Sequence, residues 1–325
     1  MTTSSASIDP QSIPVIDFGP FLSGGPAERQ AVAAQMRKAS ADRGFFYLAN
    51  HGLPAELLER SFQASRDFFA LPAEEKAEVA WQNASSNRGY VAVRRERLDP
   101  TKPGDLKEAF NAGPELTDAT LTAAERPYRE NRWPAARPQF RAAVLELLQG
   151  CVTTSNRVLE AFALALDLPE TFFVDSHDQL HHTLRLLHYP PLPEGFVPQD
   201  GESRAGTHTD YGSITLLFQD DVGGLEVRTR DGRWIAATPI PGTVVVNTGD
   251  LMERWTNHVF CSTPHRVIVS EQAASRDRYS IAFFCHPNAD AVISCIDTCV
   301  DETNPQRYPP ITAGEHLMER LNATY

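Results

Sequence analysis

From residue 183 to residue 284 the chain consists of short β-rich runs, and no helical pattern separates them. The runs cover residues 183–189, 213–218, 224–227, 233–237, 243–247, 265–269 and 278–284. Turn-forming pairs such as Gly223-Gly224, Asp231-Gly232 and Pro241-Gly242 lie between them. A parallel sheet needs crossover helices, so this pattern predicts an antiparallel sandwich or barrel of the jelly-roll (double-stranded β-helix) type.

The first half of the chain has a different character, because apolar residues recur there at helical spacing. We expect helices over 27–43, 54–70, 72–80 and 138–167, short strands over 13–17 and 44–48, an irregular stretch over 82–134 and a C-terminal helix over 311–323. Residues 1–12 are expected to be disordered. The prediction is one mainly β domain with α-helices, in which a mostly helical region (13–170) packs on a jelly-roll core (180–290).

Charge and cysteine content narrow the function classes. The formal net charge is -12, and an acidic surface repels phosphate backbones and anionic lipid. The N-terminus lacks a basic start with an apolar run, and no stretch approaches the roughly 20 apolar residues of a membrane span. The five cysteines form no CxxC pair, which favours free thiols. We therefore expect a cytoplasmic protein with a small-molecule substrate and no nucleic-acid or membrane partner; its oligomeric state stays open.

Three residues have the composition of a mononuclear iron site. His208 and Asp210 are two apart in an extended segment, so their side chains share a face, and His265 begins a later strand. Two histidines and one carboxylate on one octahedral face leave positions open for a co-substrate and O₂, which suits Fe(II). An HxD pair alone is equally typical of an ordinary turn at a strand end.

Arg278 and Ser280 give this candidate metal site a chemical context. They share a face of the next expected strand, and a guanidinium with a hydroxyl can bind a carboxylate. A dicarboxylate such as 2-oxoglutarate would chelate iron with its keto-acid end and reach this pair with its distal carboxylate. Otherwise Arg278, within an apolar run, would need an internal Asp or Glu as its partner.

These residues resemble a known family, the 2-oxoglutarate/Fe(II)-dependent oxygenases related to isopenicillin N synthase. The resembling motifs are Gly44-Phe-Phe-Tyr-Leu-Ala-Asn-His-Gly52, His208-Thr-Asp210, Gly223-Gly-Leu225, Val246-Asn-Thr-Gly-Asp250, His265-Arg-Val267 and Arg278-Tyr-Ser280. The runs Asn87–Tyr90, Leu184–Pro190 and Arg204–Gln219 look most like those of the thymine dioxygenases. That resemblance implies a planar, nucleobase-like substrate.

The resemblance also implies roles for individual residues. It assigns His208, Asp210 and His265 to iron, and Arg278, Ser280 and Tyr189 to 2-oxoglutarate. By similarity to the thymine dioxygenases, Tyr211 and Phe284 sandwich the substrate while Arg185 hydrogen-bonds its carbonyl edge. Leu187 departs from the pattern, because many plant members carry Asn at this position. The implied reaction is a hydroxylation that uses Fe(II), 2-oxoglutarate and O₂ and releases succinate and CO₂.

Other functions remain open at this point. An iron oxidase without 2-oxoglutarate, acting on a substrate bound directly to the metal, would use the same three ligands. A non-catalytic jelly-roll binding module would keep the scaffold but needs neither the metal ligands nor the carboxylate-binding pair. A zinc hydrolase is disfavoured, because no general base is evident near the three ligands.

Overall fold

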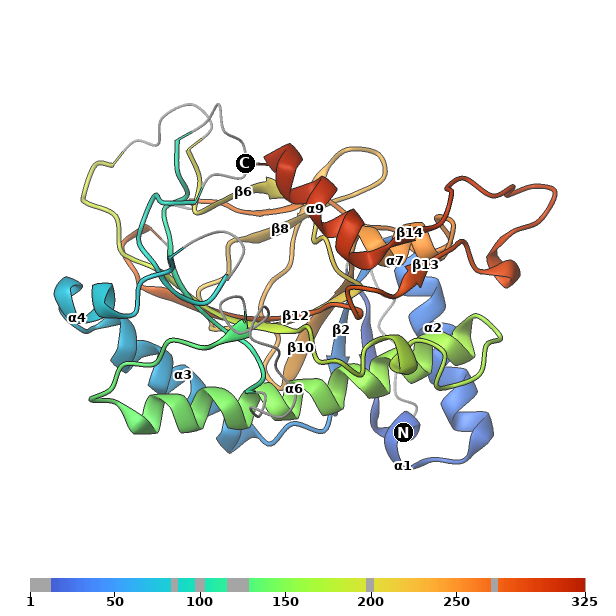
Figure 1. Cartoon of the computed structure of the whole chain (residues 1–325), viewed down its shortest axis with the longest axis horizontal. Helices are drawn as coiled ribbons and strands as arrows, with labels where there is room; N and C mark the ends of the chain where they lie inside the picture. Colours follow the sequence, from blue (N-terminus) through green and yellow to red (C-terminus); the bar gives the residue numbers. More distant parts are fainter. Residues whose placement is uncertain are drawn as a thin grey trace, which may run out of the picture.

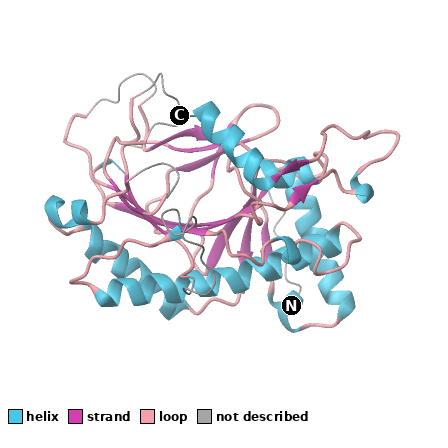
Figure 2. Ribbon diagram, viewed as in Figure 1, coloured by secondary structure: helices cyan, strands magenta, loops and turns pink. Residues whose placement is uncertain are grey.

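Two stacked β-sheets with a helical layer beneath them make up the computed structural model (Figures 1 and 2). The structure describes residues 13–82, 87–96, 103–115, 129–196, 202–269 and 274–324; the expected disordered segment 1–12 lies outside these ranges. The antiparallel jelly-roll architecture expected from the sequence is confirmed.

The larger sheet has the strand order β1-β2-β10-β7-β12-β5-β4-β3, and the smaller one has the order β6-β11-β8-β9. Only the β1–β2 pair of the larger sheet is parallel. The strands of the larger sheet are β1 (Val15–Asp17), β2 (Phe45–Ala49), β3 (Gly89–Val91), β4 (Glu108–Ala112), β5 (Thr183–Tyr189), β7 (Ile214–Gln219), β10 (Thr243–Thr248) and β12 (Arg278–Cys285). Those of the smaller sheet are β6 (Ala205–His208), β8 (Leu225–Arg228), β9 (Trp234–Ala236) and β11 (His265–Val267), and β13 (Val292–Ile293) pairs separately with β14 (Ile311–Thr312).

Helices cover the outer face of the larger sheet: α3 and α6 lie below it in Figure 1, and α2 lies at its right-hand end. The helices are α1 (Gly19–Ser23), α2 (Pro26–Asp42), α3 (Ala55–Phe69), α4 (Ala73–Glu78), α6 (Pro138–Ala165), α7 (Asp250–Trp255) and α9 (Ala313–Thr324), with short 3₁₀ turns at Val174–Ser176 and Asp297–Cys299. The C-terminal helix α9 lies on the opposite side of the molecule from α6, above the larger sheet in Figure 1. Within the described part of the chain, no helix is long and apolar enough to cross a bilayer.

Alternation along the strands sends side chains into two separate cores. On β12, Ile281 and Phe283 pack into the core between the larger sheet and the helices, whereas Ala282 faces the smaller sheet. Because side chains alternate, Arg278, Ser280 and Phe284 lie on the same face as Ala282. The polar residues predicted to bind ligands therefore lie between the two sheets.

Three features differ from the sequence-based expectation. Strands β3 and β4 fall in the stretch expected to be irregular, and they extend the larger sheet beyond β5. The short helix α7 separates β10 from β11, so the β-rich half is not free of helices as predicted. Helix α1 occupies residues just before the expected break at Gly24. All five cysteines are free, in agreement with the prediction.

Candidate active site

The three predicted metal ligands lie close together at one end of strands β6 and β11 of the smaller sheet. His208 ends β6, His265 begins β11, and the two residues are partners in the antiparallel register. Nε2 of His208 lies 3.9 Å from Oδ1 of Asp210, and Nε2 of His265 lies 3.7 Å from the same oxygen. One donor atom from each residue lies within 4.8 Å of the others, and the described residues contain no other His, Cys, Asp or Glu cluster of this kind. This donor set fits a single Fe(II) ion bound on one face.

Backbone carbonyls orient the two imidazoles. Nδ1 of His208 lies 2.8 Å from the Gly206 carbonyl oxygen, and Nδ1 of His265 lies 3.1 Å from that of Thr263. Each Nδ1 must carry the proton in order to donate to a carbonyl. The Nε2 lone pairs are therefore left for a metal, as is usual for histidine ligands held by a second hydrogen bond.

The carboxylate is held in the same way. Oδ2 of Asp210 accepts hydrogen bonds from Thr215 Oγ1 at 2.6 Å and Asn247 Nδ2 at 2.7 Å, which leaves Oδ1 for the metal. Burial acts to raise the pKa of Asp210, but the imidazoles and these hydrogen bonds outweigh it and lower the pKa. Burial, followed by repulsion from His265, lowers the pKa of His208 to about 3. The site therefore presents an ionised carboxylate and a neutral His208 imidazole, the forms that bind a metal.

Arg278 is a buried cation on the inner face of β12, with only 1% of its surface exposed. Its guanidinium donates to the Gly223 carbonyl at 2.6 Å, to Gln219 Oε1 at 3.2 Å and to Ser280 Oγ at 3.4 Å, and it lies over the Tyr189 ring at 4.6 Å. Among the described residues, no Asp or Glu forms an ion pair with it. Asp220 interacts with Arg278 only at longer range, so the guanidinium has no directly bonded carboxylate among the described residues, and a carboxylate ligand fits this position.

Sequence reasoning missed a second buried arginine at this end of the site. Arg204 is completely buried, and burial followed by repulsion from Arg278 lowers its pKa. Its guanidinium donates to the carbonyl of Arg276 at 3.2 Å. The only sequence signal was its place just before β6, within a motif shared with the family. Asn247 and Thr215, which hold Asp210, lie within family-like motifs, but those motifs did not indicate this role.

The three residues predicted to contact the primary substrate lie around the same interior. Arg185 is on the inner face of β5 and forms an ion pair with Glu96, which the sequence analysis did not single out. Tyr211 directly follows the ligand Asp210, and the guanidinium of Arg320 lies 5.2 Å from its ring centroid. Phe284 is half-buried and packs at the edge of the core between the sheets.

Three further histidines near these strands are not part of the metal cluster that the described residues form. His188 faces the helical side of the larger sheet, where its two ring nitrogens contact Glu108 at 2.7 Å and Asp277 at 2.6 Å. His182 is completely buried, and His181 contacts Gln179. Leu187, the departure from the plant pattern, is the register partner of Ser280 and adds an apolar contact instead of an amide.

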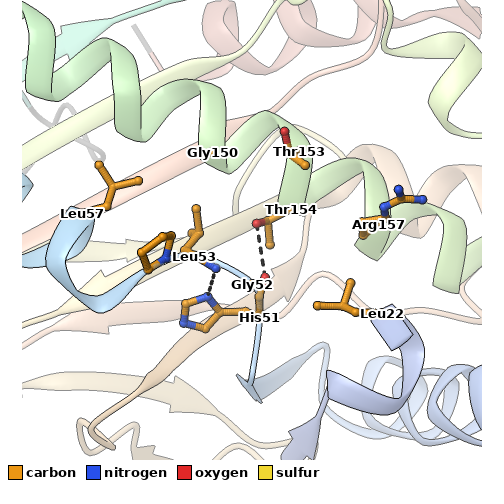
Figure 3. Close-up of a pocket in the computed structure, with 10 residues that line it drawn as sticks. Leu22, His51, Gly52, Leu53, Leu57, Gly150, Thr153, Thr154 and Arg157 are labelled. Carbon is orange, nitrogen blue, oxygen red and sulfur yellow. Dashed lines mark hydrogen bonds between the residues drawn. The ribbon is translucent and has the colours of Figure 1, made fainter. Parts of the chain in front are cut away.

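A hollow of about 310 Å³ lies elsewhere, between α6 and the loop after β2 (Figure 3). Its lining is mostly apolar and includes Leu53, Leu57 and Gly150. Thr154 Oγ1 donates to the His51 carbonyl at its edge, at 3.4 Å. None of the predicted ligand-binding residues lines this hollow.

Family models match most of the chain. Residues 13–136 match the N-terminal domain described as "non-haem dioxygenase in morphine synthesis", and residues 180–287 match the 2OG-Fe(II) oxygenase superfamily. The second match contains all the predicted metal and 2-oxoglutarate ligands.

Individual relatives agree with these matches. A 2-oxoglutarate-Fe(II) type oxidoreductase of Emericella nidulans is 35% identical, covering 97% of this chain and 91% of the relative. The crystal structure of Neurospora crassa thymine 7-hydroxylase with α-ketoglutarate and thymine is 37% identical, with a TM-score of 0.88 over 99% of this chain and 100% of the other. A putative 2OG-Fe(II) oxygenase of Caulobacter crescentus is 34% identical, with a TM-score of 0.86 over 97% and 99% of the two chains.

The similarity to named 2-oxoglutarate-dependent enzymes decides among the functions that the sequence left open. It favours the 2-oxoglutarate-dependent reaction over an oxidase without this co-substrate, a zinc hydrolase or a non-catalytic module. The chain belongs to the 2OG-Fe(II) oxygenase superfamily and is a non-haem iron dioxygenase that uses Fe(II), 2-oxoglutarate and O₂.

Proposed function

We propose that this protein hydroxylates a small, planar, thymine-like heterocycle, with release of succinate and CO₂. The observation that supports the substrate class is the nearly complete structural similarity to a thymine 7-hydroxylase determined with thymine bound. The positions of Arg185, Tyr211 and Phe284 near the candidate metal site support the same substrate class.

In this proposal His208, Asp210 and His265 hold the iron through Nε2, Oδ1 and Nε2. When bound, Fe(II) supplies O₂ activation coupled to oxidative decarboxylation of 2-oxoglutarate and oxidation of a substrate C–H bond. Arg278, with Ser280, binds the distal carboxylate of 2-oxoglutarate, and the ring of Tyr189 packs against the guanidinium.

The remaining inner residues orient the primary substrate. Tyr211 and Phe284 offer flat apolar surfaces on which a heterocycle stacks, and such contacts exclude water from the reacting face. Arg185 donates hydrogen bonds to a carbonyl at the edge of the ring. Each of these residues positions the substrate, and none is needed to transfer a proton.

A succinate-release assay with Fe(II), 2-oxoglutarate and O₂ tests the proposal across thymine, uracil, purines and small aromatic acids and amides. We expect thymine or a close pyrimidine to stimulate succinate formation and to yield a hydroxylated product by mass spectrometry. Stimulation by another class, with none by pyrimidines, would refute the substrate assignment and leave the enzyme class intact. Loss of substrate-dependent succinate formation in His208→Ala is the accompanying expectation for the metal ligands.

A further inference from the structure

Four charged side chains form a continuous ionic chain beside the site. The carboxylate of Glu96 bonds to the Arg185 guanidinium, and its Oε2 lies 3.6 Å from Nζ of Lys107. Lys107 in turn forms an ion pair with Asp105. The order Arg185, Glu96, Lys107, Asp105 alternates positive and negative charge.

This ionic chain lies on the substrate side of the interior. Arg185 is opposite Ala282 in the β5–β12 register, so its side chain projects between the two sheets. Asp105 accepts the Gly206 N–H at 3.0 Å, two residues before His208. The ionic chain therefore extends from the inner face of β5 to the backbone two residues before the metal ligand His208.

The four charges cancel, and all four side chains are largely removed from water. The exposed fractions are 15% for Arg185, 13% for Glu96, 7% for Lys107 and 5% for Asp105. Burial acts to raise the pKa of Glu96, but Arg185 and Lys107 outweigh it and lower the pKa. Glu96 is therefore ionised at neutral pH and neutralises the guanidinium beside it.

Arg278 lies on the same face of the larger sheet as Arg185, and the two arginines differ in their partners. Arg278 has no described Asp or Glu partner and fits the 2-oxoglutarate carboxylate, whereas Arg185 has a carboxylate of the chain itself. A carboxylate that approaches Arg185 would have to displace Glu96 or share the guanidinium with it. Like charges brought together in a buried site oppose binding, which is how a site rejects an unwanted ligand.

We propose that Glu96 is a specificity-determining residue that neutralises the substrate side of the site and so selects uncharged substrates over carboxylates. The proposal rests on the proposed function, in which Arg185 faces the primary substrate. Glu96 also keeps 2-oxoglutarate out of the substrate position, so that this dianion binds only at Arg278. Without Glu96, Arg185 and Lys107 together would exceed Asp105 by one positive charge.

The test uses the anaerobic Fe(II)·2-oxoglutarate holoenzyme and measures binding by calorimetry. The probes are matched neutral and anionic pyrimidines, namely thymine with 5-carboxyuracil and uracil with orotate. We expect the wild type to bind the acids at least about tenfold more weakly than the neutral partners, and Glu96→Gln to bind the acids at least about tenfold more tightly than the wild type does. Glu115→Gln is the matched control, because it removes an ion pair between Glu115 and Arg141 that is not part of the ionic chain. In this control the preference for neutral over acidic pyrimidines should stay as in the wild type.

A second measurement separates this proposal from the substrate assignment. Excess 2-oxoglutarate should titrate to one site per iron in the wild type and reveal an additional, weaker site in Glu96→Gln. If no pyrimidine binds the wild type, the proposed substrate class fails, while the 2-oxoglutarate titration still tests Glu96. If Glu96→Gln gains neither acid affinity nor the additional site, the role of Glu96 is refuted.

Variants of Lys107 provide the opposite change in charge. Lys107→Met leaves one net negative charge and should weaken acid binding further, so it replaces Glu96→Gln as the test if that variant does not fold. The double variant Glu96→Gln/Lys107→Met restores neutrality and should regain the wild-type preference. Because Gln has almost the size and shape of Glu, a purely steric role would leave Glu96→Gln as selective as the wild type, and a double variant that stays as permissive as Glu96→Gln would show that the charge balance is not the cause; either result would refute the proposal.

Discussion

Hydrogen bonds to Oδ2 of Asp210 fix the orientation of its carboxylate, and Oδ1 is the oxygen assigned to the metal. Thr215 and Asn247 both donate to Oδ2, so the carboxylate cannot rotate without breaking two hydrogen bonds, and Oδ1 keeps its place between the imidazoles. Residues that orient a ligand in this way influence metal affinity without touching the metal.

Asn247→Ala tests this restraint. Removing one donor frees the carboxylate to reorient, so we expect the affinity for Fe(II) to fall by about 10–100-fold. Anaerobic titration of Fe(II) in the presence of 2-oxoglutarate, followed by the visible charge-transfer band, measures the change. Thr243→Ala, which removes a polar side chain from the same strand remote from Asp210, serves as the control. Equal Fe(II) affinities for the two variants would contradict the orienting role.

Arg278 owes its proposed role to geometry as well as to charge. Lysine keeps the charge but cannot offer two parallel N–H groups to a carboxylate. We expect Arg278→Lys to raise the apparent KM for 2-oxoglutarate by about 10–100-fold, the loss of one or two charge-assisted hydrogen bonds. Steady-state kinetics with varied 2-oxoglutarate check this. Arg276→Lys is the matched control, because Arg276 pairs with Asp221 at the surface, and a comparable increase there would refute the assignment.

Local sequence signals explain why some of these residues were predicted and others were not. Arg278 and Arg185 stand out as charges within apolar strands, and strand parity places them correctly on the inner face. Glu96 carries no such signal, because it lies in a polar stretch, and its contact with Arg185 joins segments 89 residues apart. Residues brought together by long-range folding are not visible to a local pattern.

Among the elements, the C-terminal helix α9 contacts Tyr211, which is predicted to stack on the primary substrate. Arg320 on this helix lies over the Tyr211 ring and forms an ion pair with Asp250 at 2.9 Å. Asp250 begins α7 and also accepts from Thr209, the residue between the two ligands His208 and Asp210. Helix α9 thereby supports the segment that carries both the metal ligand and the predicted stacking residue.

Arg320→Ala removes the support of α9 at this point. Because a cation over an aromatic ring contributes about 0.5–2 kcal/mol, we expect the Kd of the primary substrate to rise by roughly 3–30-fold. Calorimetry on the anaerobic holoenzyme measures this Kd with the substrate found in the succinate screen. Arg320→Lys keeps a cation and should lie between the wild type and the alanine variant. An unchanged Kd in Arg320→Ala would show that α9 does not influence this side of the site.

Strand β4 is fixed to its surroundings by Glu108, on the face opposite the site. Its carboxylate accepts from Lys76 at 2.8 Å and Tyr90 at 2.5 Å and contacts His188 at 2.7 Å. Burial acts to raise the pKa of Glu108, but hydrogen bonds from His188, Lys76 and Tyr90 outweigh it and lower the pKa. A carboxyl with a lowered pKa stabilises the folded state above its unfolded pKa, which is 4.5, and this contribution is lost as the pH falls through the folded value.

Glu108→Gln should therefore have a pH-dependent effect on stability. Above pH 5 we expect a loss of about 3 kcal/mol in the free energy of unfolding, because Lys76 is left without its anionic partner. Below the folded pKa of Glu108 the difference from the wild type should shrink, since the wild-type carboxyl is then neutral as well. Urea unfolding at a series of pH values tests this, with the exposed Glu146→Gln as control. A difference that does not narrow in acid would exclude Glu108 as its source.

An element could be predicted only where its sequence has a clear pattern of apolar residues and turn signals. The bounds of β5 agree with the expected run 183–189, because a largely apolar run of seven residues ends there at a proline. By contrast β4 reads Glu-Ala-Phe-Asn-Ala, which favours neither state, and becomes a strand by pairing with β5. The six-residue helix α7 is too short to show helical periodicity.

At the scale of the whole molecule, the two halves of the chain share one sheet. Strands β2 and β4 come from the N-terminal region, yet β2 pairs with β10 and β4 pairs with β5. The helical layer packs on the outer face of strands from both halves. Separating the halves would break two strand pairings and expose the apolar face that α3 and α6 cover, so we propose that the chain is a single domain.

The prediction for a single domain is one cooperative unfolding transition, and the four tryptophans allow a test in each half separately. Trp81 and Trp133 report on the N-terminal region, and Trp234 and Trp255 report on the jelly-roll core. One variant replaces the first pair with Phe and the other replaces the second pair. Because each variant has its own stability, fluorescence of the remaining pair is compared with far-ultraviolet circular dichroism of the same protein. Coincident midpoints in both variants are expected, since the shared sheet couples the halves. If fluorescence and circular dichroism give separate midpoints in either variant, the N-terminal region and the core unfold as two units, and the shared sheet does not make them one.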